Sequence, residues 1–305
     1  MPTQTPSIAN HTATAVVRTL AYFAVFSHPL TKEEVHVFCG EKEVAIEEIT
    51  EILEKLKKKG QVFQFYAYYQ LKNDPAWVQR RMENNRRADS FLKPARRMAR
   101  LIGQFPYVRG VFVSGSLSKH CMRPDSDVDF FIVTEPGRLW LARTLLVLFK
   151  KVFLLNSRRY FCVNYFVDTR HLEIEEKNIF TATEVVTLLP FWGREYYEAF
   201  RAANRWASEF YPNHPPRNLS DVPPDQRGLL KRMFERLFAG SLGDRLDRRA
   251  MLFTVNYWRK KFHELDPDTF DLALKSRQGI SKHHPLHFQE KVLRQFDINF
   301  RDRHG

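Results

Sequence analysis

The sequence predicts an α+β protein in which a mixed β-sheet core is flanked by an N-terminal region of helices with a hairpin and by a C-terminal helical region. Two observations predict it: short apolar runs bounded by Gly and Asp in mid-chain, and apolar residues at helical spacing on both sides of them. The expected boundaries are 1–75, 76–180 and 181–305. A chain of 305 residues with 44% hydrophobic content can bury a core for two or three domains.

The N-terminal region, 1–75, combines helices with a short hairpin. The stretch "TAVVRTLAYFAVF" has apolar residues at helical spacing, Thr31 and Glu34 have the spacing of a capping box, and another helical pattern runs from 46 to 56. The alternating stretch "QVFQFYAYYQLK" then predicts a hairpin. Helices followed by a hairpin are typical of a winged helix.

The third helix of this region argues against sequence-specific DNA recognition. A helix that reads the major groove should present Lys, Arg, Asn or Gln to bases and phosphates. This one presents glutamates along its length, and its lysines gather at its end, at Glu47, Glu48, Glu51, Glu54, Lys55 and Lys57 to Lys59. The pattern favours a winged helix that packs or contacts a protein partner.

The centre of the chain carries the most informative stretch, "VFVSGSLSKHCMRPDSDVDFFIVT" at 111–134. The apolar run at its start predicts a buried strand, Gly115 and Ser116 a tight turn into a short helix, and "DVDFFIV" a second strand. Because strand side chains alternate, Asp127 and Asp129 are expected on one face. Paired carboxylates invite a cation such as Mg²⁺, and the free N–H groups of the glycine turn suit a phosphate.

The segment "GSLSKHCMRPDSDVDFFIV" resembles the signature of the nucleotidyltransferase superfamily related to DNA polymerase β. The resemblance implies a nucleotidyltransferase-fold sheet and transfer of a nucleoside monophosphate from an NTP to an acceptor, with release of pyrophosphate. It also implies that Asp127 and Asp129 hold Mg²⁺ or Mn²⁺ and act in catalysis. Gly115, Ser116 and Lys119 would bind the nucleotide.

The sequence departs from the superfamily at the third carboxylate, which usually comes from a later strand beside the Asp-x-Asp strand. In "RRYFCVNYFVD" the residue at the position of that third carboxylate is Asn164, which we include among the expected catalytic residues. Its amide carries no charge and cannot act as a general base. Asp168 or Glu173 could substitute only if the strand were bent or in another register. The alternative to an active enzyme is therefore a catalytically weak or inactive module that binds nucleotide or nucleic acid for regulation.

The net charge of +13 suggests an anionic partner. Residues 80–100 hold eight basic against two acidic side chains, and residues 227–261 hold ten against three. These two basic flanks are the expected contacts for RNA or DNA. Aromatic residues among the C-terminal helices are expected in the core more than on stacked bases; they are Trp206, Phe253, Tyr257 and Trp258.

Other features narrow the class of protein. Three scattered cysteines, Cys39, Cys121 and Cys162, fit neither a disulfide framework nor a zinc site, and the start of the chain lacks a signal-peptide pattern, so we expect a cytoplasmic protein without a membrane partner. The apolar run 139–155 contains charges and reads as a core helix. A histidine cluster lacks the spacing of a metal site; it consists of His283, His284 and His287. The acceptor is left open.

Overall fold

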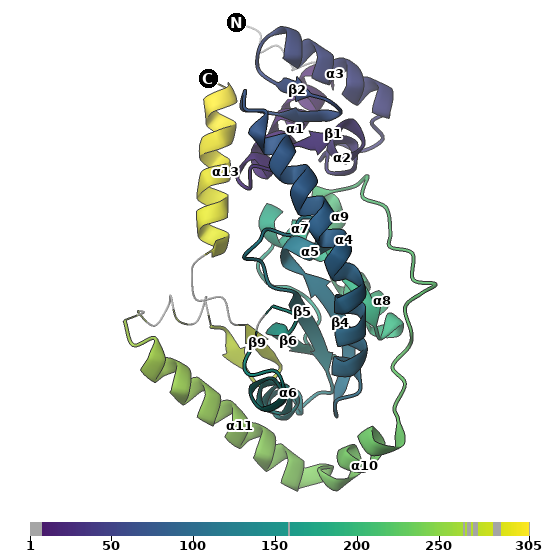
Figure 1. Ribbon diagram of the computed structural model, residues 1–305, viewed down its shortest axis with the longest axis vertical. Coiled ribbons are helices and arrows are strands. Elements are labelled where there is room, and N and C mark those ends of the chain that lie inside the picture. The colour runs from purple at the N-terminus through teal and green to yellow at the C-terminus, as the bar shows by residue number, and fades with distance from the viewer. Residues whose placement is uncertain are drawn as a thin grey trace, which may run out of the picture.

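The structure is a computed structural model that describes residues 8–157, 159–264, 266, 270, 274–282 and 288–304. It is an α+β protein with a small antiparallel sheet in its N-terminal part and a larger mixed sheet beyond it (Figure 1). The predicted α+β class is thereby confirmed. The histidine cluster at 283–287 lies outside the described residues.

The N-terminal part packs helices around the small sheet, whose strand order is β1-β3-β2. Its elements are α1 (Ile8–Ala24), β1 (Leu30–Thr31), α2 (Lys32–Val37), α3 (Ile46–Lys58), β2 (Phe63–Phe65) and β3 (Tyr68–Gln70). The predicted capping box is confirmed: the Glu34 amide donates to Thr31 Oγ1, and the Thr31 amide donates to the Glu34 carboxylate. Helix α3 buries Ile49, Ile52, Leu53 and Leu56, as their spacing predicts.

The larger sheet has the strand order β7-β4-β5-β6-β9-β8. Strand β5 is antiparallel to β4 and parallel to β6, so the sheet is mixed. The elements that build it are α4 (Ala76–Gly103), β4 (Val108–Ser114), α5 (Gly115–Ser118), β5 (Asp129–Thr134), α6 (Leu139–Phe153), β6 (Cys162–Asp168), α7 (Ile179–Thr187), β7 (Leu189–Trp192), α8 (Arg194–Ala203) and α9 (Ala207–Phe210).

Helices cover both faces of this sheet. On one face, Val111, Phe130 and Ile132 pack against α4 and α6. On the other, Phe112 and Phe131 join a core that includes α7, α8 and the N-terminal helices. Alternation along β4 and β5 therefore sends successive side chains into two separate cores, which is why these strands read as continuous apolar runs.

The C-terminal part differs from the expected set of helices because it also supplies strands. The sequence predicts helix through "TATEVVTLLPFWG", but α7 ends at Thr187 and β7 follows. Pro190 disfavours a helical conformation at Leu189, and an edge strand tolerates its missing N–H. The remaining elements are α10 (Leu229–Leu237), α11 (Gly240–Lys261), β8 (Ser276–Arg277), β9 (Ile280–Lys282) and α13 (Phe288–His304).

Helix α13 returns to the N-terminal part and packs against α1, so both ends of the described chain lie at the same end of the molecule (Figure 1). Tyr22 and Phe296 make an edge-to-face contact there. No described helix is long and apolar enough to cross a membrane. Helix α6 buries Leu139, Trp140 and Leu146, in line with the core helix that the sequence predicts.

Candidate functional site

The predicted glycine turn and carboxylate meet at one end of the β4–β5 pair, where Ser114 is the partner of Asp129. Gly115 follows with φ +65°, a conformation that glycine adopts without strain. A Cβ at Gly115 would lie 2.7 Å from Asp129 Oδ2. Only a residue without a side chain lets the backbone approach the carboxylate this closely.

Asn164, the residue that the sequence motif places next to the Asp-x-Asp strand, lies beside the same carboxylate. Its Nδ2 donates to Asp129 Oδ1 over 2.9 Å. The register of β5 with β6 shifts here: Phe130 is the partner of Val163, but Phe131 is the partner of Tyr165. Asn164 is therefore the extra residue of a β-bulge, a device that re-aims side chains and is frequent near active sites.

Cys162 completes this small polar network. Its thiol donates to Asn164 Oδ1 over 3.2 Å. Burial, with the Asp129 and Asp127 charges adding to it, raises the pKa of Cys162 to about 12, so the thiol stays protonated and acts as a donor. Because the thiol donates to the amide oxygen, the amide nitrogen faces Asp129. Asn164 thus holds the carboxylate rather than offering its oxygen as a third metal ligand.

The charges of the two aspartates interact. Strand β5 begins at Asp129, so Asp127 precedes it and the strand periodicity does not fix its direction. The pKa of Asp129 is raised to about 6, mainly by burial; the charges of Asp127 and Glu184 also raise it, whereas the Cys162 thiol and Lys119 oppose the rise. A cation held between the aspartates would relieve this unfavourable charge.

Glu184, on α7, is a site residue that sequence reasoning missed. Its Oε2 accepts a hydrogen bond of 3.3 Å from the Gly115 amide, and its Oε1 accepts one of 2.8 Å from Lys119 Nζ. Lys119 also donates to the Gly115 carbonyl over 3.2 Å. The amide that we expect to bind phosphate therefore holds a carboxylate here. One feature of the sequence could have pointed to Glu184: it is an acidic residue in a helix whose neighbouring positions are apolar and buried, among them Ala182, Val185 and Val186.

The other predicted residues lie apart from this cluster. The Ser116 hydroxyl contacts Met122 Sδ at 3.3 Å. Asp168 is the partner of Thr134 at the far end of β5 from Asp129, where its Oδ1 accepts a hydrogen bond from the Arg170 amide. Glu173 pairs with Lys177 at 2.7 Å. The bulge at Asn164 does not bring Asp168 to the site, so Asp168 does not take the place of a third carboxylate beside Asp129.

The donor set fits magnesium only in part. Among the described residues, no group of three or more His, Cys, Asp or Glu side chains is placed to hold a metal ion. Asp127 and Asp129 nonetheless provide two hard oxygen donors, one of them with a raised pKa. Magnesium binds in this way in many phosphate-handling sites, through one or two carboxylates and the substrate's own phosphates. The site therefore fits the ion when a nucleotide comes with it.

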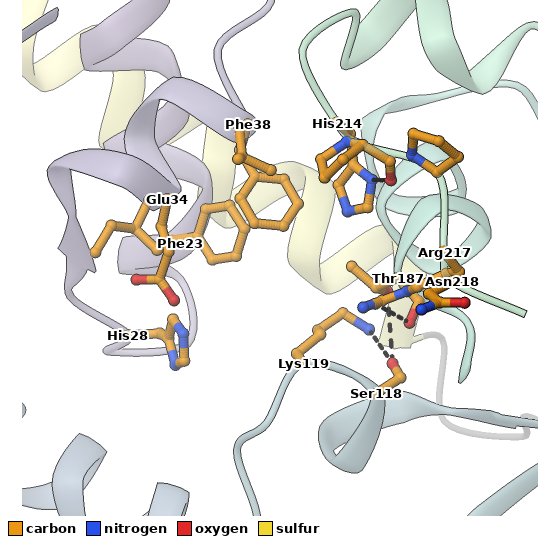
Figure 2. Close-up of a pocket in the computed structure, with 14 residues that line it drawn as sticks. Phe23, His28, Glu34, Phe38, Ser118, Lys119, Thr187, His214, Arg217 and Asn218 are labelled. Carbon is orange, nitrogen blue, oxygen red and sulfur yellow. Dashed lines mark hydrogen bonds between the residues drawn. The ribbon is translucent and has the colours of Figure 1, made fainter. Parts of the chain in front are cut away.

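A cavity of about 340 Å³ borders the site on the side of the N-terminal part. Figure 2 shows Lys119 and Ser118 at one edge with Arg217 near them, and Phe23 on α1 and Phe38 just after α2 at another edge. Arg217 donates to the Thr187 carbonyl over 3.0 Å, and its buried Nε has no hydrogen-bond partner in the described part of the chain. Ser118 and Lys119 connect this cavity with the glycine turn, because both line the cavity and both donate to the Gly115 carbonyl.

Comparisons of the chain with protein-family models, with curated proteins and with solved structures find no match. The function must therefore be argued from the geometry of Gly115, Asp129 and their neighbours.

Proposed function

We propose that this chain is a nucleotidyltransferase that uses Mg²⁺ or Mn²⁺ to move a nucleoside monophosphate from an NTP to an acceptor hydroxyl. One observation carries the proposal: the Gly115 turn lies so close to the Asp129 carboxylate that a Cβ at Gly115 would be 2.7 Å from its Oδ2. A triphosphate on the turn and a cation on the aspartates would therefore meet. The order strand, glycine turn, carboxylate strand, with Asn164 on the neighbouring strand, supports a nucleotidyltransferase fold for 76–180.

Each residue has a role in this proposal. Asp127 and Asp129 would hold the metal, which when bound supplies positive charge to the phosphates. The Gly115 amide and Lys119 would exchange the Glu184 carboxylate for phosphate oxygens. The acceptor oxygen then forms a bond to the α-phosphorus, the bond to the bridging oxygen of the β-phosphate breaks, and pyrophosphate leaves with that electron pair. The acceptor's proton passes to a carboxylate or to water.

Two places in the molecule could hold an acceptor. The cavity beside Lys119 would accommodate a small molecule with an apolar body and an anionic group, since Phe23 and Phe38 line it together with Arg217. The basic helix α4 would instead bring RNA or DNA. The acidic face of α3 suits a protein partner for the winged-helix region that we propose for 1–75. Free thiols at Cys39, Cys121 and Cys162 fit a reducing cytoplasm.

The test is incubation with each labelled NTP and Mg²⁺ in the presence of total cellular RNA, protein or metabolites. Label that moves to one of these fractions, with release of pyrophosphate, identifies the acceptor class. Asp129→Asn should abolish the transfer. No transfer from any NTP would end the assignment as an enzyme.

A second candidate function is an inactive nucleotide-binding or nucleic-acid-binding regulatory module. Two observations favour it: Asn164 stands where the third carboxylate is expected and donates to Asp129, and Glu184 occupies the Gly115 amide. This module would bind NTP in the presence of Mg²⁺ but release no pyrophosphate, and the same assay separates the two functions.

A further inference from the structure

Helix α10 is amphipathic, and its apolar side faces outward. Five large apolar side chains at spacings of one, three and four residues form one side of this helix. Their exposed fractions are 85% for Leu229, 73% for Leu230, 58% for Met233, 42% for Phe234 and 64% for Leu237. In Figure 1 this helix lies at the end of the molecule opposite the two termini. A helix of a globular protein normally turns such a face to the core.

The polar side of α10 is buried and bonded, which fixes this orientation. Lys231 is 2% exposed, and its Nζ donates to the Gly103 carbonyl over 2.9 Å and to Asp225 over 2.7 Å. Glu235 accepts from the Tyr107 amide over 2.7 Å and from Arg109 over 2.8 Å. Rotating the helix to bury its leucines would leave these buried charges without partners, at a high cost. The bonds of Lys231 and Glu235 therefore keep the apolar face of α10 turned outward.

Exposed arginines lie on α10 and near the start of α11, close in sequence to this apolar face. Arg232 and Arg236 on α10, and Arg245, Arg248 and Arg249 at the start of α11, are exposed, and none forms an ion pair with a described residue. On α11, Phe253 and Tyr257 are 77% and 55% exposed, so they are not the core residues that the sequence predicts. The second basic flank thus mixes free cations with exposed large apolar side chains.

The combination of exposed arginines and exposed apolar side chains favours one kind of partner over the others. Nucleic acid would use the arginines but leave Leu230 and Met233 in water. A second copy of the chain would bring arginine against arginine. An anionic bilayer uses both groups, since apolar side chains of a surface helix enter the boundary between headgroups and acyl chains while cations contact the headgroups.

We propose that α10 and the adjoining start of α11 bind the surface of an anionic lipid bilayer. Leu229, Leu230, Met233 and Leu237 enter the headgroup boundary, and Arg232 and Arg236 contact anionic headgroups. Such contact needs no spanning helix, and it departs from the sequence-based expectation of no membrane partner. It stands independently of the nucleotidyltransferase proposal, because none of its residues belongs to that site.

The test is co-sedimentation of the full chain with phosphatidylcholine vesicles that contain phosphatidylserine, compared with vesicles of phosphatidylcholine alone. Binding is expected to the mixed vesicles and to be much weaker to the neutral ones. Leu230→Ser with Met233→Ser should weaken binding about tenfold or more, because two inserting side chains are lost. Arg232→Gln with Arg236→Gln should remove most of the preference for phosphatidylserine.

Matched controls keep the outcome clear. Tyr66→Ser removes a side chain that is 87% exposed on the β2–β3 turn, far from α10, and should leave binding unchanged. The variants change exposed side chains, so their melting temperatures should match that of the parent chain. The proposal is overturned if the mixed vesicles do not bind at low salt, or if Leu230→Ser with Met233→Ser binds as well as the parent. It is also overturned if these two substitutions instead abolish self-association in sedimentation velocity.

Discussion

Asn164 Nδ2 donates a 2.9 Å hydrogen bond to Asp129 Oδ1 across the parallel strands β5 and β6. The β-bulge at Asn164 makes this contact possible. An amide here satisfies one lone pair of the carboxylate without adding charge, and the protonated Cys162 thiol fixes its direction. The pair is thus a stable arrangement for the metal-free protein, and in the proposed nucleotidyltransferase it would take the place of a third carboxylate.

The substitution Asn164→Asp tests whether this amide limits activity. A carboxylate at this position would lie against Asp129 and repel it, so the metal-free variant should be less stable, by about 1–2 kcal/mol. Mg²⁺ with NTP should recover that stability and create or raise NTP-dependent transfer, since a charged ligand and a potential base are added. Asn164→Ala is the control for loss of the hydrogen bond alone. Unchanged transfer in Asn164→Asp, with normal folding, would show that the amide is not the limiting feature.

The double substitution Asp127→Asn with Asp129→Asn tests the metal assignment. In the parent chain, NTP should raise the melting temperature more with Mg²⁺ than with EDTA, because binding to the folded state stabilises it. The double variant should lose this difference. Its metal-free form should be no less stable than the parent, because the pKa of Asp129 is already raised by burial and the neutral side chain is tolerated there. A magnesium-dependent shift that survives the double substitution would remove these residues as ligands.

Local patterns in the sequence predict much of this site. The turn at Gly115 and the strand that begins at Asp129 follow from short-range periodicity. The placement of Asn164 beside Asp129 is instead what the resemblance to the nucleotidyltransferase superfamily implies. The sequence predicts Asp127 and Asp129 on one face of a strand, but alternation does not fix the direction of Asp127, because the strand begins two residues after it. A pattern of alternation cannot show where a strand starts when both cores are apolar.

Long-range contacts account for what the sequence does not predict. Glu184 reaches the Gly115 amide from a helix 69 residues further along the chain, and no local signal links the two. Helix α10 reads as an ordinary amphipathic helix, and only the partners of Lys231 and Glu235 show that its apolar face is turned outward. Strand β7 is missed because its four residues are too short for a period to emerge.

Substitution of four exposed basic residues of α4 tests nucleic-acid binding. Arg86, Lys93, Arg97 and Arg100 recur at spacings of seven, four and three residues and make no ion pair with a described residue. Changing all four to Gln should weaken RNA and DNA binding alike and reduce its salt dependence. Filter binding at several salt concentrations measures both effects.

Two other arginines of α4 form hydrogen bonds within the protein, and one of them serves as the control. Arg81 bonds to Glu34 and the Pro29 carbonyl, and Arg87 bonds to the Met122 carbonyl over 2.8 Å. Arg87→Gln should therefore lower stability with little further effect on binding. Negligible affinity of the parent chain for RNA and DNA at low salt would remove nucleic acid from the partners.

The cavity predicts a pH dependence of stability through His214. Burial, with the charge of Arg217 adding to it, lowers the pKa of His214 from 6.5 to about 4. A lowered pKa means that only the unfolded chain binds the proton between these values. The free energy of unfolding should therefore fall as pH drops from 6.5 towards 4, by up to about 1.4 kcal/mol per pH unit. His214→Gln should show a smaller fall in urea titrations at a series of pH values, whereas the exposed His263→Gln should match the parent.

Glu184→Gln tests whether this carboxylate competes with the nucleotide for the glycine turn. Glu184 now accepts from both the Gly115 amide and Lys119, so a triphosphate must displace an anion to reach either donor. The neutral side-chain amide of the variant competes less, and NTP affinity should rise several-fold in isothermal titration. The metal-free variant should lose about 1 kcal/mol or less, because the Lys119 pair is partly exposed. Glu173→Gln removes a carboxylate that pairs only with Lys177 among the described residues and should leave NTP affinity unchanged. If Glu184→Gln abolishes magnesium-dependent NTP binding instead of strengthening it, then Glu184 belongs to the metal-binding set. The third carboxylate missing from β6 would in that case come from α7.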